Sequence, residues 1–394
     1  MSAENSRFLA ATQTLRFGAH VVAKNRMYFS SMGMDICDEF GFPKPEFFAV
    51  YQSLMAGGCG FGFLGNASVD ANSRYNSCGL KLTSTAHAEA LRPLFQVAHE
   101  QKFLLGVQLQ HYGQQGIPSE ETGIILSPSA IVSQLILDQY PHAHAVAMSE
   151  VQILRCIDQF SAAAHLAQQA GASLIQIQAS NGYLVSSFLS PKTNQREDDW
   201  GGTPIKRAKL LLSIVDGVRK ATGDQLAVTV RLGINDGLGE EGQHVELLGE
   251  VVAALEASGV CAITCSVGIS ETFRFFFKDR QKAQVISRGG CRYLKRFARI
   301  PIGFTGSVMD VAEASAIIEY GDADFIGFGR AMLADNHFIA KELSGRKDLV
   351  KRCRGDAFCF RDKKEPMAAR VYCCVNPDYQ RPEKLQQYYE ENRT

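Results

Sequence analysis

The sequence has no excess charge of either sign, no long hydrophobic run and no evident leader. Lys and Arg together number 41, and Asp and Glu also number 41, so the formal net charge is zero. This balance argues against a bulk electrostatic partner such as nucleic acid or an anionic membrane, although it allows a local basic pocket for a phosphate. No apolar stretch approaches the roughly 20 residues needed to span a bilayer. The first residues, MSAENSRFLAATQT, lack the basic region and apolar core of a signal peptide. We therefore expect a cytoplasmic protein with no membrane partner.

The cysteines lack the arrangement of a disulfide framework. The chain of 394 residues contains 11 of them, an odd number, scattered along its length. This pattern indicates reduced thiols in a cytosolic setting. The hydrophobic content of 46% and the charged content of 21% are ordinary for a soluble globular enzyme. The length suits one large barrel with insertions, or two domains.

A dinucleotide-binding fingerprint is also missing. Gly60, Gly62 and Gly65 formally match the pattern G-x-G-x-x-G. That motif must follow a strand and open a helix, whereas these glycines follow a predicted helix and lead into an apolar strand. We interpret them as a helix stop combined with close packing.

What the sequence does contain is a regular alternation of short apolar strands and amphipathic helices. Every strand except the sixth is followed by a clear helix; after the sixth, the pattern predicts a loop at 270–289 and a short helix near 291–299. Eight such units predict an α/β fold, a (β/α)8 TIM barrel, with a doubly wound sheet as the alternative. We expect residues 1–345 to form this domain and residues 346–394 to form a C-terminal extension packed on it. The predicted strands are at 27–31, 62–67, 105–111, 174–179, 226–232, 262–267, 302–305 and 325–327.

In a barrel of this type, the C-terminal ends of the strands carry the functional side chains. Glycine-rich ends after strands seven and eight can hold a phosphate through backbone N–H groups, and Arg330 can add charge-assisted hydrogen bonds. Arg231, in a strand that reads as buried, can stabilise the anionic form of a reduced flavin. The alternatives are that the glycines only make tight turns and that Arg231 forms a surface salt bridge. The candidates at the strand ends are Ser30, Ser31, Met32, Gly33, Ala67, Gln108, Gln178, Asn181, Tyr183, Arg231, Gly306, Ser307, Gly329 and Arg330.

Several spaced motifs resemble the old yellow enzyme family of FMN-dependent oxidoreductases. The resemblance runs from about residue 16 to residue 377. Asn194, Gln195 and Arg196, followed by Asp199, look like the family's signature after strand four, although Trp200 stands where a tyrosine is usual. The most specific segments are QLQHYG at 108–113, NGYLVSSFLSPKTNQREDDWGG at 181–202, VRL at 230–232 and GFGRAML at 327–333.

The resemblance implies an NAD(P)H-dependent enzyme that binds FMN non-covalently at the barrel mouth. NADH or NADPH reduces the flavin, and a small-molecule substrate with an electron-poor double bond then takes its place. It implies Tyr183 as proton donor, and Asn181 and Gln178 as donors to the substrate's carbonyl oxygen. The FMN site would be formed by Ser30, Ser31, Met32, Gly33, Ala67, Gln108, Arg231, Gly306, Ser307, Gly329 and Arg330. A homo-oligomer is compatible with this reading.

The chain departs from the family at several site positions. Gln178 stands where a histidine is usual, and a glutamine amide is neutral at every pH. Gly33 replaces a Thr or Cys, Asp35 stands where some members have a tyrosine, and Asn66 replaces a common Glu. These departures leave room for a flavin-dependent dehydrogenase that forms a double bond on a specialised substrate. Two further alternatives are a catalytically silent flavin-binding protein and a non-redox phosphate-binding barrel, an isomerase or lyase, for which Lys192 is the nearest candidate.

The C-terminal cysteines resemble part of a metal site. Larger family members hold an iron–sulfur cluster with four cysteines after the barrel, and two further domains follow the cluster. We expect those two domains to be absent here because the chain stops at Thr394. Cys353, Cys359 and Cys373 match three of the positions, and Asp356 occupies the second. We expect packed free cysteines and no metal, with a zinc site or a [4Fe–4S] cluster as alternatives. The excursion at 112–148 and the Phe-rich loop at 270–289 are expected to shape the substrate pocket.

Overall fold

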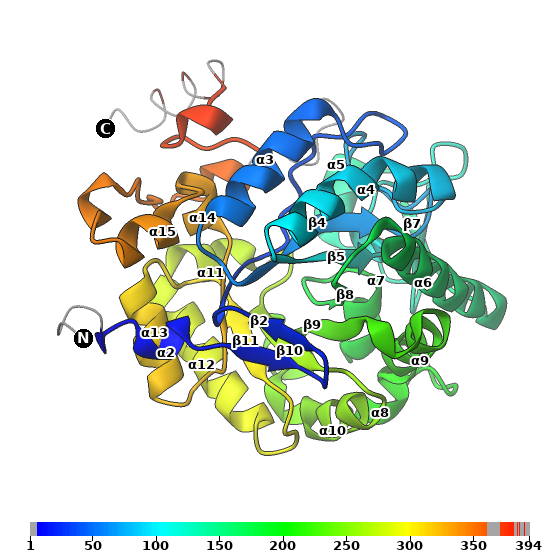
Figure 1. Cartoon of the computed structure of the whole chain (residues 1–394). Helices are drawn as coiled ribbons and strands as arrows, with labels where there is room; N and C mark the ends of the chain where they lie inside the picture. Colours follow the sequence, from blue (N-terminus) through cyan, green and yellow to red (C-terminus); the bar gives the residue numbers. More distant parts are fainter. Residues whose placement is uncertain (1–5, 361–370, 382–383, 385, 387–389, 391–394) are drawn as a thin grey trace.

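The computed structural model describes residues 6–360, 371–381, 384, 386 and 390, and its central feature is a closed parallel barrel wrapped by helices (Figure 1). Neighbouring strands of the barrel are parallel, and the last, β12, pairs with the first, β3, to close it. The predicted α/β fold, a (β/α)8 TIM barrel of eight strands, is confirmed. The strands are β3 (Met27–Phe29), β4 (Phe61–Ser68), β5 (Leu104–Gln110), β8 (Leu174–Ala179), β9 (Ala227–Asn235), β10 (Ala262–Val267), β11 (Ile302–Thr305) and β12 (Ile326–Phe328).

Helices follow the strands and cover the outside of the barrel. Local capping explains where several of them begin and end: the Ser84 hydroxyl accepts a hydrogen bond from the His87 backbone N–H, and Ser149 and Gln152 form a capping box. Gly171, with φ of 102°, ends the longest of these helices in the left-handed conformation. The helices are α3 (Pro45–Ala56), α4 (Thr85–Glu100), α6 (Glu150–Ala170), α9 (Lys209–Thr222), α10 (Gly249–Ala257), α12 (Arg280–Leu294), α13 (Val311–Glu319) and α14 (Arg330–Ala334).

The sixth βα unit differs from the prediction. Where a loop at 270–289 and a short helix at 291–299 were expected, the structure has α11 (Phe273–Lys278) and the long helix α12. Adjacent glycines lowered the apparent helix propensity of this stretch. However, Asp279 caps α12 by accepting from the Lys282 N–H. A Cβ at Gly290 would lie only 2.3 Å from Ile234 Cδ1, so this glycine lets the helix pack closely on β9.

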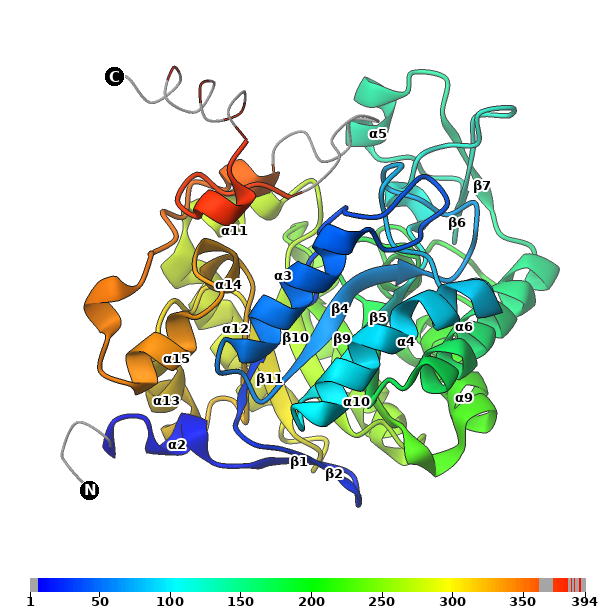
Figure 2. The ribbon, with the colours of Figure 1, turned by 45° about the horizontal axis from the view of Figure 1, so that its top comes forward.

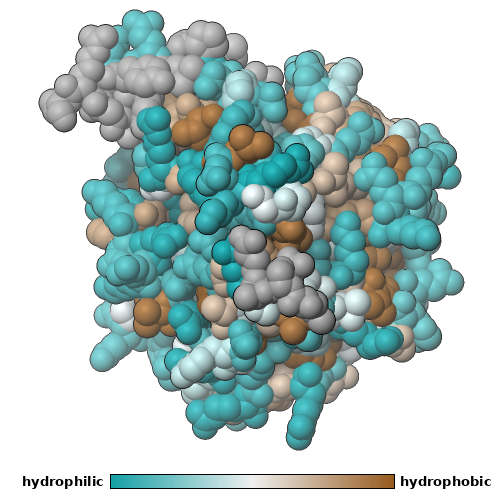
Figure 3. All heavy atoms as spheres, turned by 60° about the vertical axis from the view of Figure 1, so that its left-hand side comes forward, coloured by the Kyte–Doolittle hydropathy of each residue, from teal (hydrophilic) through white to brown (hydrophobic). Residues whose placement is uncertain are grey.

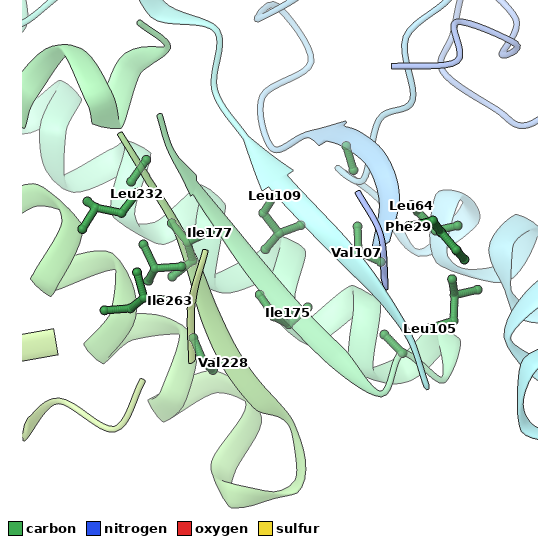
Figure 4. Packing of buried hydrophobic residues seen from close by; sticks show 14 of the residues in the cluster. Phe29, Leu64, Leu105, Val107, Leu109, Ile175, Ile177, Val228, Leu232 and Ile263 are labelled. Carbon is green, nitrogen blue, oxygen red and sulfur yellow. The ribbon is translucent and has the colours of Figure 1, made fainter. Parts of the chain in front are cut away.

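Alternate residues of each strand face outward and pack against the helices. Leu105, Val107 and Leu109 of β5 and Ile175 and Ile177 of β8 lie in one buried cluster between the two layers (Figure 4). The residues between them therefore face the barrel interior, since successive side chains of a strand point to opposite sides.

The inward-facing residues become more polar toward the barrel mouth. The lower, apolar layer packs against Phe17 of the N-terminal hairpin formed by β1 (Leu15–Phe17) and β2 (Val21–Ala23), which closes the bottom of the barrel (Figure 2). Nearer the mouth, the inward-facing side chains carry amide, hydroxyl and guanidinium groups. The polar groups at the mouth therefore lie on the barrel strands themselves. On β8 the series from bottom to mouth is Leu174, Gln176 and Gln178, in register with Ala227, Thr229 and Arg231 of β9.

The excursion after β5 carries its own small sheet, and the family signature fastens it to the barrel. The sheet pairs β6 (Ile124–Ser127) with β7 (His144–Ala147), and α5 (Gln134–Gln139) lies between them in the chain. Nη1 of Arg196 donates to the carbonyl oxygens of Pro128 at 2.9 Å and Met148 at 2.8 Å. The same guanidinium pairs with Asp198 at 2.6 Å. This stretch of the signature therefore holds the architecture together rather than lining the cavity described below.

The G-x-G-x-x-G glycines lie in and just before β4, as interpreted from the sequence. A Cβ at Gly62 would lie 2.2 Å from the Phe29 ring, and one at Gly65 would lie 1.7 Å from the Met32 carbonyl oxygen. These glycines therefore allow close approach of the first two barrel strands, and they do not open a helix.

The described part of the C-terminal extension contacts the barrel at several points. Val371 N donates to Met34 O at 2.9 Å, and Asn376 Nδ2 donates to Leu333 O at 2.9 Å. Because residues 361–370 and most of those after 381 lie outside the described residues, the division into residues 1–345 and 346–394 stays a prediction. Figure 3 shows the face of the molecule that lies on the left in Figure 1. On this face, hydrophobic residues form small patches separated by hydrophilic ones. Within the described ranges, no helix is long and apolar enough to cross a membrane.

Candidate functional site

A cavity of about 540 Å³ opens at the C-terminal ends of the barrel strands. This volume falls in the range of about 300–1,000 Å³ typical of small-molecule sites. Because the strands are parallel, their ends meet here, and nearly all the predicted site residues lie on the wall. They are Ser30, Ser31, Met32, Gly33, Gln108, Gln178, Asn181, Tyr183, Arg231, Gly306, Ser307, Gly329 and Arg330.

Ala67 is the predicted residue that does not line the cavity. Its side chain is completely buried in the outer hydrophobic cluster. The pairing of β4 with β5 shifts register between Leu64 and Ala67, and such an irregularity redirects the side chains that follow it. Asn66 reaches the cavity instead.

Arg231 and Arg330 bring positive charge into the cavity without a carboxylate partner among the described residues. Arg231 makes long contacts to two hydroxyls, at 3.4 Å to Ser30 Oγ and 3.2 Å to Ser266 Oγ, and its Nε has no partner. Burial lowers the pKa of Arg231, since desolvation disfavours the charged form. Nη1 of Arg330 is also buried without a partner. Both arginines are partly buried, and buried donor atoms without a partner are costly unless a ligand satisfies them, so this cavity is suited to an anion.

A chain of polar side chains forms the floor of the cavity. Ser31 Oγ donates to Gln108 Oε1 at 3.0 Å, and Gln108 Nε2 donates to Gln176 Oε1 at 2.7 Å. Gln176 Nε2 in turn lies 3.4 Å from Thr264 Oγ1. The chain fixes the orientation of the Gln108 amide and leaves its second N–H without a partner among the described residues, so it can meet a polar ligand edge.

Gln178 and Asn181 form a hydrogen bond with each other, and Asn181 also bonds to residues at the C-terminal end of β10. Asn181 Nδ2 donates to Gly268 O at 3.1 Å and to Ser266 Oγ at 3.3 Å. Because a carbonyl oxygen can only accept, the atom facing Gly268 must be the NH2 group, and Asn181 Oδ1 must face the Gln178 amide nitrogen 3.4 Å away. Asn181 has φ of 64°, an uncommon value for a residue with a side chain. Both N–H groups of Asn181 are therefore occupied, while Gln178 keeps one for a ligand.

Tyr183 lies at the end of a short row of tyrosine rings. Its ring meets Tyr112 edge to face with centroids 5.5 Å apart, and Tyr112 stacks on Tyr75 at 5.8 Å. Burial raises the pKa of Tyr183 to about 12, although the Arg231 charge acts in the opposite direction. Tyr183 is therefore a neutral hydroxyl, able to give a proton, across the physiological range.

The backbone after β11 leaves open space at Gly306. This residue has φ of 99°, and a Cβ there would meet nothing within 4 Å. Ser307 follows with φ of 65°. The Gly306 N–H itself donates to the Gly327 carbonyl oxygen at 3.3 Å, so what this open, left-handed turn offers a phosphate is room on the cavity wall that it shares with Arg330.

Several residues on the cavity wall were not predicted. Ser266 occupies an inward position within β10, and Tyr112 lies in the QLQHYG motif two residues beyond Gln110, so the strand alternation could have found both. Tyr75 and Phe360 come from segments with no strand pattern, and only the folded chain brings them here. Phe273, Phe276 and Phe277 line the cavity, in line with the expectation that the Phe-rich stretch shapes it.

One of the C-terminal cysteines, Cys359, lines this cavity. Cys374 Sγ lies 3.5 Å from Asp356 Oδ2. No disulfide bond joins Cys353, Cys359, Cys373 or Cys374 to another described cysteine. Within the described part of the chain, no three His, Cys, Asp or Glu side chains are placed to hold a metal ion.

Lys192, the nearest lysine candidate for a non-redox barrel enzyme, is an exposed side chain that pairs with Glu241. It does not belong to the cavity wall. Lys192 therefore cannot serve as the nucleophile of an isomerase or lyase that acts in this cavity.

Comparison with known proteins points in one direction. Residues 13–348 match the model of the NADH:flavin oxidoreductase / NADH oxidase family. The NADH oxidase of Thermoanaerobacter brockii is 25% identical over 360 residues, which are 91% of this chain and 54% of that protein. The NADPH dehydrogenase of Bacillus subtilis (strain 168) is 29% identical over 333 residues, which are 82% of this chain and 91% of that protein. The chain thus spans about half the length of the first relative and nearly all of the second.

The fold also matches solved structures. An old yellow enzyme homologue from Zymomonas mobilis has a TM-score of 0.72 at 21% identity, covering 96% of this chain and 99% of that one. At this identity the likeness shows the fold alone.

Proposed function

Because the chain belongs to the NADH:flavin oxidoreductase / NADH oxidase family, which is FMN-dependent and uses NAD(P)H, we propose that it reduces an electron-poor carbon–carbon double bond. One observation carries this proposal. A single cavity combines Arg231 and Arg330, which have no carboxylate partner among the described residues, with Gln178, Asn181 and Tyr183. The arginines suit an anionic cofactor, and the other three suit a substrate that bears a carbonyl group.

The cavity wall fits FMN. Arg330 and the open backbone at Gly306 and Ser307 would hold the phosphate, whereas Arg231 and Gln108 would face the polar edge of the ring system. A cation beside that edge favours the reduced, anionic form. When bound, FMN supplies two-electron hydride chemistry between the nicotinamide and the substrate.

Gln178 is the side chain best placed to bind the substrate's carbonyl oxygen. It has an amide N–H without a partner among the described residues, whereas both N–H groups of Asn181 are bonded within the protein. Donation to a carbonyl stabilises the enolate-like charge that develops as the double bond is reduced. In this arrangement Asn181 orients Gln178, and it becomes a second donor only if its contact with Ser266 is released.

Tyr183 would complete the reaction by giving its hydroxyl proton to the α-carbon. The raised pKa of Tyr183, about 12, keeps this proton in place at neutral pH. Because the hydroxyl is protonated at neutral pH, Tyr183 is in the form that can give a proton, and it could accept one from a saturated substrate only after losing its own.

A second candidate is a flavin-dependent dehydrogenase that forms a double bond on a specialised substrate. The occupied N–H groups of Asn181 favour it, because they leave fewer donors to activate a carbonyl group. It would need a proton acceptor other than Tyr183.

Anaerobic assays with a matched substrate pair separate the two candidates. The protein with FMN and NADPH is given 2-cyclohexenone, and separately the oxidised protein is given cyclohexanone with an artificial electron acceptor. Reduction of the enone, with no reaction of the saturated ketone, is the expected result. Oxidation of the ketone with no reduction of the enone would move the dehydrogenase to first place.

A further inference from the structure

Three phenylalanines from distant parts of the chain pack together at the wall of the cavity. Phe273 and Phe277 lie on α11, and Phe360 lies in the C-terminal extension. Phe273 and Phe277 stack with ring centroids 5.3 Å apart. Phe360 approaches Phe277 at 4.9 Å and Phe273 at 6.4 Å. All three rings line the cavity, so we name them the phenylalanine cluster.

Arg330 lies against this cluster. Its guanidinium carbon is 4.6 Å from the ring centroid of Phe277, a separation at which a cation is attracted to the aromatic face. Nη1 of Arg330 is buried and has no hydrogen-bond partner. The ring of Phe277 is therefore a contact that can orient this guanidinium.

The exposure of the cluster argues that it does more than fill the core. Phe360 is 46% exposed, whereas Phe276, on the same short helix as Phe277, is 9% exposed. An aromatic ring left this open to solvent gives up part of the free energy that burial would supply. What links Phe360 to Arg330 is its contact with Phe277, whose ring lies against the guanidinium.

We propose that Phe277, supported by Phe360 of the C-terminal extension, positions Arg330 for the phosphate of FMN. The inference rests on the proposed function, in which Arg330 binds that phosphate. Arg330 contacts the cofactor, and the two phenylalanines act through it as positioning residues. An arginine has many rotamers, so a ring that holds the guanidinium in place reduces the conformational entropy lost on binding. The extension is then part of the cofactor site and not only a cover for the barrel.

The test compares two ligands that differ only in the phosphate. FMN and riboflavin are titrated into the full-length apoprotein, and dissociation constants are taken from the change in flavin fluorescence. F277L is expected to weaken FMN binding about tenfold and to leave riboflavin binding unchanged, since only the phosphate contact depends on Arg330. F277Y keeps the ring and should bind FMN like the wild type.

Three more variants complete the design. F360L should weaken FMN binding by a smaller factor than F277L, again without affecting riboflavin. F275L is the matched control, because Phe275 is on the same helix but is 58% exposed and does not line the cavity. R330Q should remove most of the preference for FMN over riboflavin, and adding F277L to R330Q should cause no further loss.

The outcomes separate this inference from the proposed function. Equal loss of FMN and riboflavin in F277L would mean that the ring only supports the fold, and the inference would be wrong. A full effect of R330Q with none of F277L would also overturn the inference while leaving the phosphate assignment intact. An unchanged preference for FMN in R330Q would overturn the phosphate assignment itself. Should F277L not fold, F360L gives the same contrast at a more exposed position.

Discussion

Gln178 donates a hydrogen bond to Asn181, with Nε2 of the first lying 3.4 Å from Oδ1 of the second. The direction of this bond follows from the Gly268 carbonyl, which accepts from the other end of the Asn181 amide at 3.1 Å. The pair is therefore asymmetric: one amide is locked inside the protein, and the other keeps a donor for the substrate. A neutral pair of this kind works without a titrating group.

Gln178→Leu tests that asymmetry because it removes the free donor at nearly constant volume. Loss of one oxyanion donor typically lowers the rate constant by about 10²-fold, and we expect kcat/KM for an enone to fall by about that factor. The FMN dissociation constant serves as the control and should not change. Unchanged kcat/KM in Q178L would mean that Asn181 or another group binds the carbonyl.

Tyr183→Phe removes the proposed proton and keeps the ring that packs on Tyr112 at 5.5 Å. General acid catalysis contributes about 10²- to 10⁴-fold, so the substrate-reducing half-reaction should slow by that amount. Reduction of the bound flavin by NADPH needs no such proton and should stay within about twofold. Stopped-flow measurement resolves the two half-reactions. A Y183F variant that reduces the enone at the wild-type rate would remove Tyr183 from the mechanism.

The pH profile follows from the same residues. Burial raises the pKa of Tyr183 to about 12, so the protonated form persists as pH rises through the ordinary range of a tyrosine. The stability that this neutral form contributes is fully present below about pH 10 and is lost only as pH rises through about 12. We expect the substrate-reducing rate to be flat from about pH 6 to 10.

Gln178→His is the companion variant for the pH experiment. A histidine can titrate, and burial beside Arg231 would lower its pKa from the ordinary value, so Q178H should acquire a pH dependence on the acid side that the wild type lacks. A wild-type rate that already falls on such an acid limb would show that a titrating group other than Gln178 assists the reaction.

Arg196→Met tests the assignment of the family signature to architecture. The variant loses charge-assisted bonds to the carbonyl oxygens of Pro128 and Met148, and we expect the free energy of unfolding to fall by about 2–4 kcal/mol. Lys206→Met is the matched control, because its ion pair with Asp199 joins side chains that are 49% and 72% exposed and should contribute little. Urea denaturation measures both. Lost FMN binding in a fully stable R196M would contradict the architectural role.

The strand alternation predicted most of the fold, and nearly all the site residues predicted at the strand ends lie on the cavity wall. Because side chains alternate along a strand, Gln108, Gln178 and Arg231 could be assigned to the barrel interior before any coordinates existed. The full length of the sixth helix was not predicted because Gly289 and Gly290 weaken the helical pattern, although Gly290 lies where a Cβ would meet the end of the Ile234 side chain. Helix propensity alone predicts that such a glycine interrupts the helix, whereas tertiary packing can keep the helix continuous through it.

The parts of the site that the sequence did not predict arise from irregular backbone and long-range contacts. The register shift in β4 directs the Ala67 side chain into the hydrophobic core, and no sequence pattern indicates that shift. Tyr75 and Phe360 reach the cavity from loops, where side-chain direction depends on the whole fold. The hydrogen bond between Gln178 and Asn181 also depends on a long-range contact, because the Gly268 carbonyl in the loop after β10 sets its direction.

The most direct test of the central claim is to follow the two hydrogen atoms added to the substrate. The protein with FMN reduces 2-cyclohexenone anaerobically, once with NADPH deuterated at C4 and once in deuterated water, and the product is analysed by NMR. The account predicts the nicotinamide deuterium at the β-carbon and solvent-derived deuterium at the α-carbon, with the second addition slowed in Y183F. Consumption of NADPH without any new C–H bond in the enone would contradict it.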